Sequence, residues 1–171
     1  MNTAIWQKID QSARNLTPFL LSIALVLITV LPSGIPGLAA VAPPLALMSI
    51  YHWTVYRPNQ LPVSAVFVVG LLHDLLTGAP LGLFTLVFLT AYGVTLTQRR
   101  FVAGKSFLIY WFGFTQIAAG AAFESWVLAC GWTFSLLDPR AVVFQYLVTI
   151  GLFPLIAGAF LRWQQALLPL E

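Results

Sequence analysis

The longest stretch without a charged residue constrains this chain more than any other feature. Between Arg14 and Arg57 the sequence contains no Asp, Glu, Lys or Arg, and a helix that crosses a bilayer needs about 20 apolar residues. The stretch therefore has room for two spans. Of the 171 residues, 60% are hydrophobic and 8% are charged, and the mean hydropathy is +0.90, whereas soluble domains are about 45–50% apolar. The composition predicts an integral membrane protein.

Proline, glycine and charged residues divide the chain into six apolar blocks, because these residues interrupt apolar helices. The expected fold class is all-α: a polytopic membrane protein with six transmembrane helices and one membrane-embedded domain, residues 1–171. Pro43 and Pro44 predict an irregular start for the second span, and Asp138 before Pro139 predicts an N-cap for the sixth. The predicted spans are 16–31, 38–56, 61–77, 81–98, 106–131 and 139–161.

Residues 1–15 precede the first span and carry apolar side chains at helical spacing between polar ones, namely Ile5, Trp6, Ile9 and Ala13. This pattern predicts a short amphipathic helix that lies on the inner membrane surface. A frayed, disordered terminus is the alternative.

The basic residues predict the orientation of the chain. If the N-terminus is cytoplasmic, every basic residue except Arg140 falls on the cytoplasmic side, as the positive-inside rule requires. Both termini should then be cytoplasmic. The formal charge of +3 does not indicate a nucleic-acid partner, because the basic residues are scattered between apolar blocks. Cys130 is the only cysteine, which excludes an intramolecular disulfide and a cysteine-based metal cluster.

Ionisable residues inside the predicted spans are the candidate functional residues, because charge in a bilayer is costly and is usually paired. His73, Asp74, Glu124 and Arg140 all fall near the outer end of their spans, so we expect them at one membrane level, where they can pair. Three roles stay open: a structural one, a cavity that opens to the periplasm and binds a ligand or partner helix, and catalysis. No nucleophile motif, zinc signature or phosphate loop specifies a reaction, so we expect no enzyme, cofactor or metal.

Small residues follow helical spacing on two spans. The fifth span has one stripe, made of Gly113, Gln116, Gly120, Glu124 and Gly131, which suits close helix packing. On the third span, Gly70, Asp74 and Gly78 are spaced by four, which lets a neighbouring backbone approach and supply a hydrogen bond.

Three further residues, Gly78, Pro80 and Gly82, surround the turn between the third and fourth spans. Backbone geometry explains them, and a periplasmic recognition surface is the alternative. His52 lies near the inner end of the second span, where we interpret it as an interfacial residue without a role.

The segment "YHWTVYRPNQLP" followed by "FVVGLLHDLLTGAPLGLFTL" resembles the MreD family of bacterial rod-shape-determining membrane proteins. Glycines, prolines and one acid in a fixed order carry the resemblance. The matching positions include Arg57, Pro58, Pro62, Gly70, Asp74, Gly78, Pro80 and Gly82.

The resemblance implies a non-enzymatic subunit of the cell-elongation machinery in the bacterial inner membrane. Its implied partner is the bitopic protein MreC, through which cytoplasmic MreB filaments connect to the peptidoglycan synthase of RodA and a class B penicillin-binding protein, with RodZ directly or indirectly involved. The resemblance carries over no catalytic residue, and it leaves a homo-oligomer open.

The family is also similar in architecture to the substrate-binding subunits of energy-coupling-factor vitamin transporters, which gives an alternative function. Those subunits typically carry two alanines four residues apart in the first span, and "LLSIALVLITV" lacks this pair. Its absence disfavours the transporter alternative.

Overall fold

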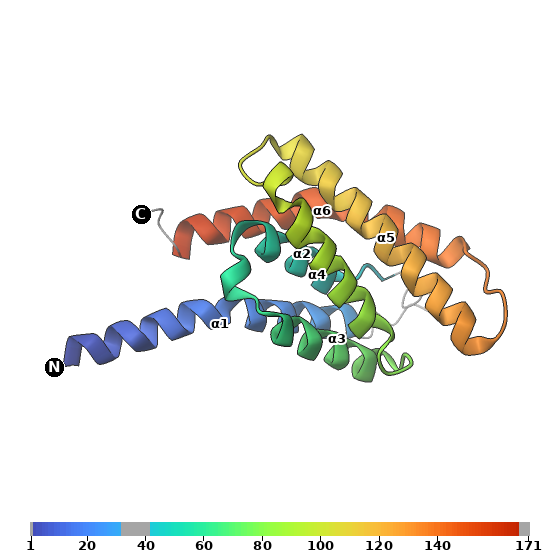
Figure 1. Cartoon of the computed structure of the whole chain (residues 1–171), viewed down its shortest axis with the longest axis horizontal. Helices are drawn as coiled ribbons and strands as arrows, with labels where there is room; N and C mark the ends of the chain where they lie inside the picture. Colours follow the sequence, from blue (N-terminus) through green and yellow to red (C-terminus); the bar gives the residue numbers. More distant parts are fainter. Residues whose placement is uncertain (1, 32–41, 168–171) are drawn as a thin grey trace.

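The computed structural model describes the backbone of residues 2–31 and 42–167 and the side chains of residues 16–31 and 42–163. Within these ranges the chain is all-helical and contains no strand, which confirms the all-α part of the predicted fold class (Figure 1). The elements are α1 (Asn2–Val30), α2 (Leu45–Tyr56), the short 3-10 helix η2 (Pro58–Gln60), α3 (Val63–Thr77), α4 (Leu83–Val102), α5 (Phe107–Thr133) and α6 (Arg140–Leu167).

One helix in the described part of the chain is long and apolar enough to cross a membrane, the segment Arg140–Trp163 of α6. Two shorter apolar segments are Leu16–Val30 of α1 and Val63–Thr77, which is α3. α4 has 20 residues and carries two arginines in its last turn. α5 has 27 residues but contains Gln116 and Glu124, which lower its mean hydropathy. The six-span topology stays a prediction.

α2 is shorter than the span predicted at 38–56. The helix begins at Leu45, directly after Pro43 and Pro44, because proline cannot donate the N–H that a helix interior needs. Residues 38–41 of the predicted span lie outside the described residues. α2 has 12 residues, a length of about 18 Å.

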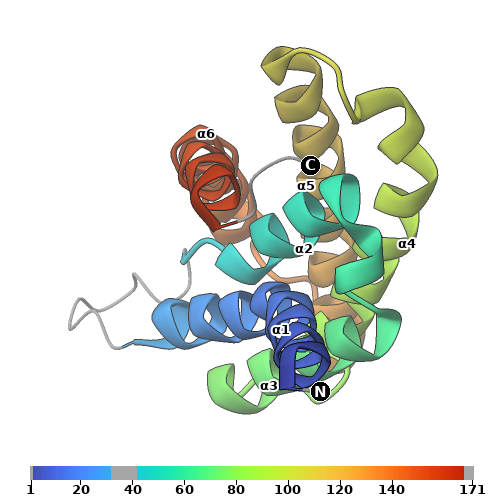
Figure 2. The same ribbon diagram turned by 90° about the vertical axis from the view of Figure 1, so that its left-hand side faces the viewer.

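The position of α2 explains why it is apolar on all sides. Every residue from 46 to 55 is buried, and α2 contacts α1, α4, α5 and α6. Figure 2 shows α2 in the middle of the bundle. A helix that is apolar all round is stable in a core, so α2 is the centre on which the longer helices pack.

α1 runs unbroken from Asn2 to Val30, so residues 2–15 are helical and continue directly into the first predicted span. The first proline of the chain is Pro18 and no glycine precedes it, so nothing earlier interrupts the helix. The side chains of residues 2–15 lie outside the described side chains, and their contact with a membrane surface stays a prediction.

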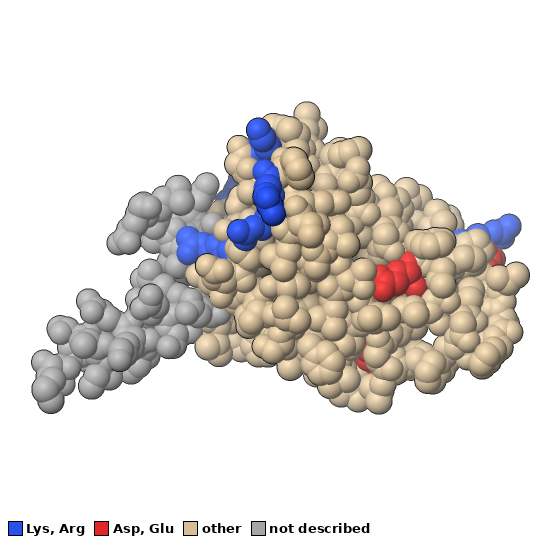
Figure 3. All heavy atoms as spheres, in the orientation of Figure 1, with Lys and Arg blue, Asp and Glu red and all other residues tan. Residues whose placement is uncertain are grey.

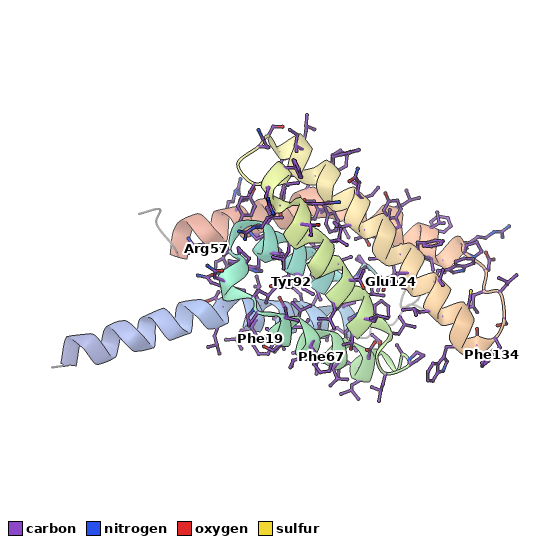
Figure 4. The ribbon with its side chains drawn as sticks, viewed as in Figure 1. Phe19, Arg57, Phe67, Tyr92, Glu124 and Phe134 are labelled. Atoms are coloured by element: carbon purple, nitrogen blue, oxygen red, sulfur yellow. The ribbon has the colours of Figure 1, made fainter. Side chains whose placement is uncertain are left out.

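The connections between helices gather at two ends of the molecule (Figure 1). The start of α1, the end of α6 and the α2–α3 and α4–α5 connections lie toward one end, and the α3–α4 and α5–α6 turns lie toward the other. Figure 4 shows Arg57 near the first end and Phe134 near the second. On the face shown in Figure 3, most basic side chains gather toward the first end.

Candidate functional site

Asp74 is fully buried on α3, and its carboxylate caps the first turn of α4. One oxygen accepts hydrogen bonds from the N–H groups of Gly82 (3.0 Å) and Thr85 (3.2 Å) and from the Thr85 hydroxyl (2.7 Å). The other oxygen accepts from the N–H of Phe84 (2.8 Å). The N–H groups of a first turn lack partners within the helix, and the helix dipole favours an anion there. Asp74 is therefore an N-cap that a neighbouring helix supplies.

Gly70 makes this capping contact sterically feasible. A Cβ on Gly70 would lie 2.5 Å from the Cα of Thr85, closer than real atoms approach. Gly70 precedes Asp74 by about one helical turn on the same face. Without a side chain at Gly70, the start of α4 comes close enough for Asp74 to reach its N–H groups.

The turn between α3 and α4 requires two glycines. Gly78 ends α3 with φ +69° and Gly82 begins α4 with φ +98°, and only glycine adopts such angles without strain. Between them, the carbonyl of Pro80 accepts the N–H of Leu83 (3.1 Å). No neighbour lies within 4 Å of a Cβ built at either glycine, so backbone conformation and not packing explains them.

His73 has different surroundings from its neighbour Asp74. Its ring is buried and packs against Phe84 and Phe88, with centroid distances of 4.4 and 5.5 Å. Its Nδ1 atom has no hydrogen-bond partner among the described residues. The two adjacent residues therefore serve different contacts, His73 in aromatic packing and Asp74 in capping.

Glu124 lies on α5 beside α4, and its side chain is half-buried. The hydroxyl of Thr90 on α4 donates to its Oε1 atom at 3.0 Å. Figure 4 shows Glu124 along the two neighbouring helices, away from the turns at either end.

Arg140 differs from our expectation. Its nearest acid is Asp138 at 3.9 Å, with both side chains exposed, and no ion pair joins Arg140 to Asp74 or Glu124 in the described residues. The reason is local: Asp138 precedes α6 in the same turn and accepts the N–H of Arg140 (3.0 Å). This contact confirms the predicted cap. The four polar residues thus fall into separate contacts.

The small-residue stripe of α5 packs closely at one position. A Cβ on Gly113 would lie 2.6 Å from the hydroxyl of Tyr51 and 3.1 Å from Val102. Gly120 and Gly131 have no atom within 4 Å of a Cβ, and Gln116 is exposed. The stripe therefore makes a close contact inside this chain at Gly113 and a hydrogen bond to α4 at Glu124, whereas Gln116, Gly120 and Gly131 are exposed.

The motif residues at the α2–α3 connection shape a tight turn. The N–H of Arg57 donates to the carbonyl of Trp53 (2.7 Å), which ends α2. Pro58 then opens η2. The carbonyl of Pro62 accepts the N–H of Ala65 (2.9 Å), which starts α3. These positions match a structural role in the turn.

Our sequence interpretation missed a buried polar cluster in the core. His52 is fully buried and not interfacial as we expected, and its Nδ1 atom lies 2.8 Å from the hydroxyl of Tyr110. The hydroxyl of Tyr51 donates to the carbonyl of Tyr110 at 2.9 Å. One signal in the sequence was available, because the helix that carries His52 and Tyr51 is apolar on every side and so predicts burial all round.

These contacts limit the chemistry of the site. All described hydrogen bonds to Asp74 come from groups at the start of α4, and Glu124 and Arg140 each have a different partner. No three His, Cys, Asp or Glu side chains come together in the described part of the chain. The arrangement matches helix capping and helix contacts.

The family model described as rod shape-determining protein MreD matches residues 13–167. The chain belongs to the MreD family. This match confirms the prediction drawn from the glycine, proline and Asp74 positions, and it gives the chain a role in rod shape determination. The MreD family is a family of shape-determining proteins and not a known family of enzymes.

Comparisons with curated proteins and with solved structures found no match. The expected likeness to energy-coupling-factor subunits therefore stays a prediction.

Proposed function

We propose that this MreD-family chain is a multi-span protein of the bacterial inner membrane with both termini in the cytoplasm. The distribution of charge supports this topology. Arg99 and Arg100 lie in the last turn of α4, and Lys105 follows in the α4–α5 connection. This connection lies toward the same end of the molecule as the α2–α3 connection (Figure 1), which begins at Arg57. Basic residues concentrate on the cytoplasmic side of membrane proteins. The start of α1 and the end of α6 lie toward that end as well (Figure 1).

The short length of α2 is compatible with this topology. α2 has 12 residues, about 18 Å, whereas the hydrocarbon core of a bilayer is about 30 Å thick. A helix that protein surrounds does not need to reach both interfaces, because its neighbours and not lipid enclose its ends. α2 has such surroundings, since α1, α4, α5 and α6 all contact it.

In this membrane setting, the chain acts as a non-enzymatic scaffold. It works with MreC to connect MreB filaments to the synthase made of RodA and a class B penicillin-binding protein. Membership of the MreD family is the observation that carries this proposal. The architecture supports it, because a chain made of helices and short connections offers partners mainly its helix faces and turns.

The test is affinity purification of the tagged chain from its native membrane in mild detergent, followed by mass spectrometry of the proteins recovered in stoichiometric amounts. We expect MreC and the elongation synthase. Depletion of the chain should also convert rod-shaped cells to round ones, and expression of the chain from a plasmid should restore the rod shape.

Two outcomes would reject the proposal. One is a purification that contains no elongation protein while a tagged RodA control from the same membranes recovers its synthase partner. The other is recovery of ATPase subunits with a membrane coupling protein, which is the composition of an energy-coupling-factor transporter.

A further inference from the structure

A row of small and polar residues runs along the outer surface where α4 and α5 meet. We name this row the α4–α5 seam. Its residues are exposed, except for the half-buried Glu124. The seam consists of Thr90, Gly93 and Thr97 on α4 and Gln116, Gly120 and Glu124 on α5.

Two contacts fix the register of the seam. Thr90 bonds to Glu124 toward one end, and Val102 lies against Gly113 toward the other. With the same rise along both antiparallel helices, Gly93 comes level with Gly120 between these contacts. A Cβ at Gly93 or Gly120 would meet no atom within 4 Å. The backbones of α4 and α5 are therefore open to an approaching helix there.

The remaining helix surfaces of the described chain differ in chemistry. Large apolar side chains dominate the exposed faces of α1, α3 and α6, among them Leu20, Ile28, Phe67, Leu75, Phe144 and Leu155. Such faces match the acyl chains of a bilayer. Figure 3 shows an acidic patch on the α4–α5 face, surrounded by uncharged atoms. Glu124 lies on this face (Figure 4). Exposing its carboxylate to lipid would cost free energy.

We propose that the α4–α5 seam docks one transmembrane helix of a different protein. This helix presents a basic side chain at the level of Glu124 and small side chains at the level of Gly93 and Gly120. The inference rests on the proposed function, because the seam faces lipid only if the chain spans the membrane. Small residues let helix backbones approach closely, and polar side chains then bond across the contact.

Charge complementarity selects this occupant over a second copy of the chain. A second copy inserted in the same orientation would bring its own residues to the same membrane depth. The basic side chains of the described helices lie toward the helix ends and not at this level, as with Arg99, Arg100, Arg140 and Arg162. A copy therefore has no cation to offer.

Lipid is also a poor occupant of the seam. Acyl chains carry no hydrogen-bond donor, and head groups lie at the interface. Thr90, the partner of Glu124, lies about 10 Å along α4 from its first residue, Leu83. A donor at this depth has to come from a side chain on a membrane helix.

The test uses the tagged chain with co-expressed MreC from the same organism as the probe, because MreC is bitopic. Two variants alter the seam, Gly120→Leu and Glu124→Leu. Gly151→Leu is the matched control, since Gly151 is an exposed glycine of α6 with no atom within 4 Å of a Cβ. Asp138→Asn controls for the loss of an exposed acid. We expect MreC recovery to fall about five- to tenfold in the seam variants, the size of one interhelical hydrogen bond or close contact, and to stay near wild type in both controls.

A photo-crosslinking amino acid at position 120 provides a second measurement. This measurement stays informative if one of the leucine variants fails to fold. Crosslinks to the transmembrane segment of MreC support the seam, and crosslinks to a second copy of the chain overturn it. Equal MreC recovery in all variants also overturns the seam but leaves the proposed scaffold intact. No MreC recovery with the wild-type chain overturns both proposals.

Discussion

Replacing Asp74 by alanine should destabilise the fold more than any substitution of an exposed acid in this chain. The change removes the acceptor for the N–H groups of Gly82, Phe84 and Thr85. An ordinary N-cap contributes about 1 kcal/mol, and a buried donor left without a partner costs about 1–3 kcal/mol. Because these terms overlap, we expect a loss of about 3 kcal/mol in the free energy of unfolding.

Asp138→Ala is a matched control for this prediction. Asp138 also accepts an N–H from a first helical turn, but its side chain is exposed, so water replaces the lost acceptor and the expected cost is about 1 kcal/mol. For a chain of this size, 1 kcal/mol lowers the melting temperature by about 2–4 °C. Asp74→Ala should therefore lower it by about 6–12 °C and Asp138→Ala by about 2–4 °C.

The assay is thermal unfolding in detergent micelles, followed by tryptophan fluorescence. Hydrogen exchange adds a local readout, because the first turn of α4 should exchange faster in Asp74→Ala and not in Asp138→Ala. If Asp74→Ala melts no earlier than Asp138→Ala and exchange at Phe84 and Thr85 is unchanged, then the capping argument is wrong.

Three further predictions follow from the same structure. Gly70→Ala places a Cβ at 2.5 Å from a Cα of α4 and should lower the free energy of unfolding by about 1–3 kcal/mol. Gly93→Ala places a Cβ with no atom within 4 Å and should be neutral or stabilising. Thermal unfolding of both variants measures the difference. Tyr110→Phe removes a hydroxyl that lies 2.8 Å from an imidazole of α2 and should cost about 1 kcal/mol in the same assay, and an unchanged melting temperature would contradict a role in stability. In a cysteine-free background, a membrane-impermeant maleimide should label Arg140→Cys in intact cells and Lys105→Cys only after permeabilisation; the same labelling of both would reject the proposed topology.

The sequence predicted the ends of most helices because proline and glycine act locally. The predicted span 61–77 became α3 (Val63–Thr77), and 106–131 became α5 (Phe107–Thr133). The start of α2 at Leu45, directly after Pro43 and Pro44, matches the irregular start that these prolines predict, although hydropathy alone does not distinguish the residues on either side of them. Hydropathy reports where a chain is apolar and not where its helix begins.

The site was harder to predict, because the depth of a residue in a membrane does not determine the direction in which its side chain points. His73, Asp74, Glu124 and Arg140 were grouped by level alone. The angle between adjacent helical residues, about 100°, already separates His73 from Asp74, but the partner that each one meets depends on the neighbouring helices. The stripe of α5 shows the same limit, since periodicity identified it and could not tell an inner contact at Gly113 from an open surface at Gly120.

Asp74 and Glu124 have distinct surroundings, and these surroundings separate stability from recognition. Asp74 is fully buried, and three backbone N–H groups and one hydroxyl donate to it, so its substitution should act through the fold and reduce partner binding only as far as the chain unfolds. Glu124 is half-buried and receives one described hydrogen bond, from Thr90, so a carboxylate has acceptor capacity left for a partner. A variant of Glu124 should therefore lose MreC while its melting temperature stays near wild type, and a variant of Asp74 should lose both together. If the two acids gave the same pattern, the division between a structural acid and a recognition acid would be wrong.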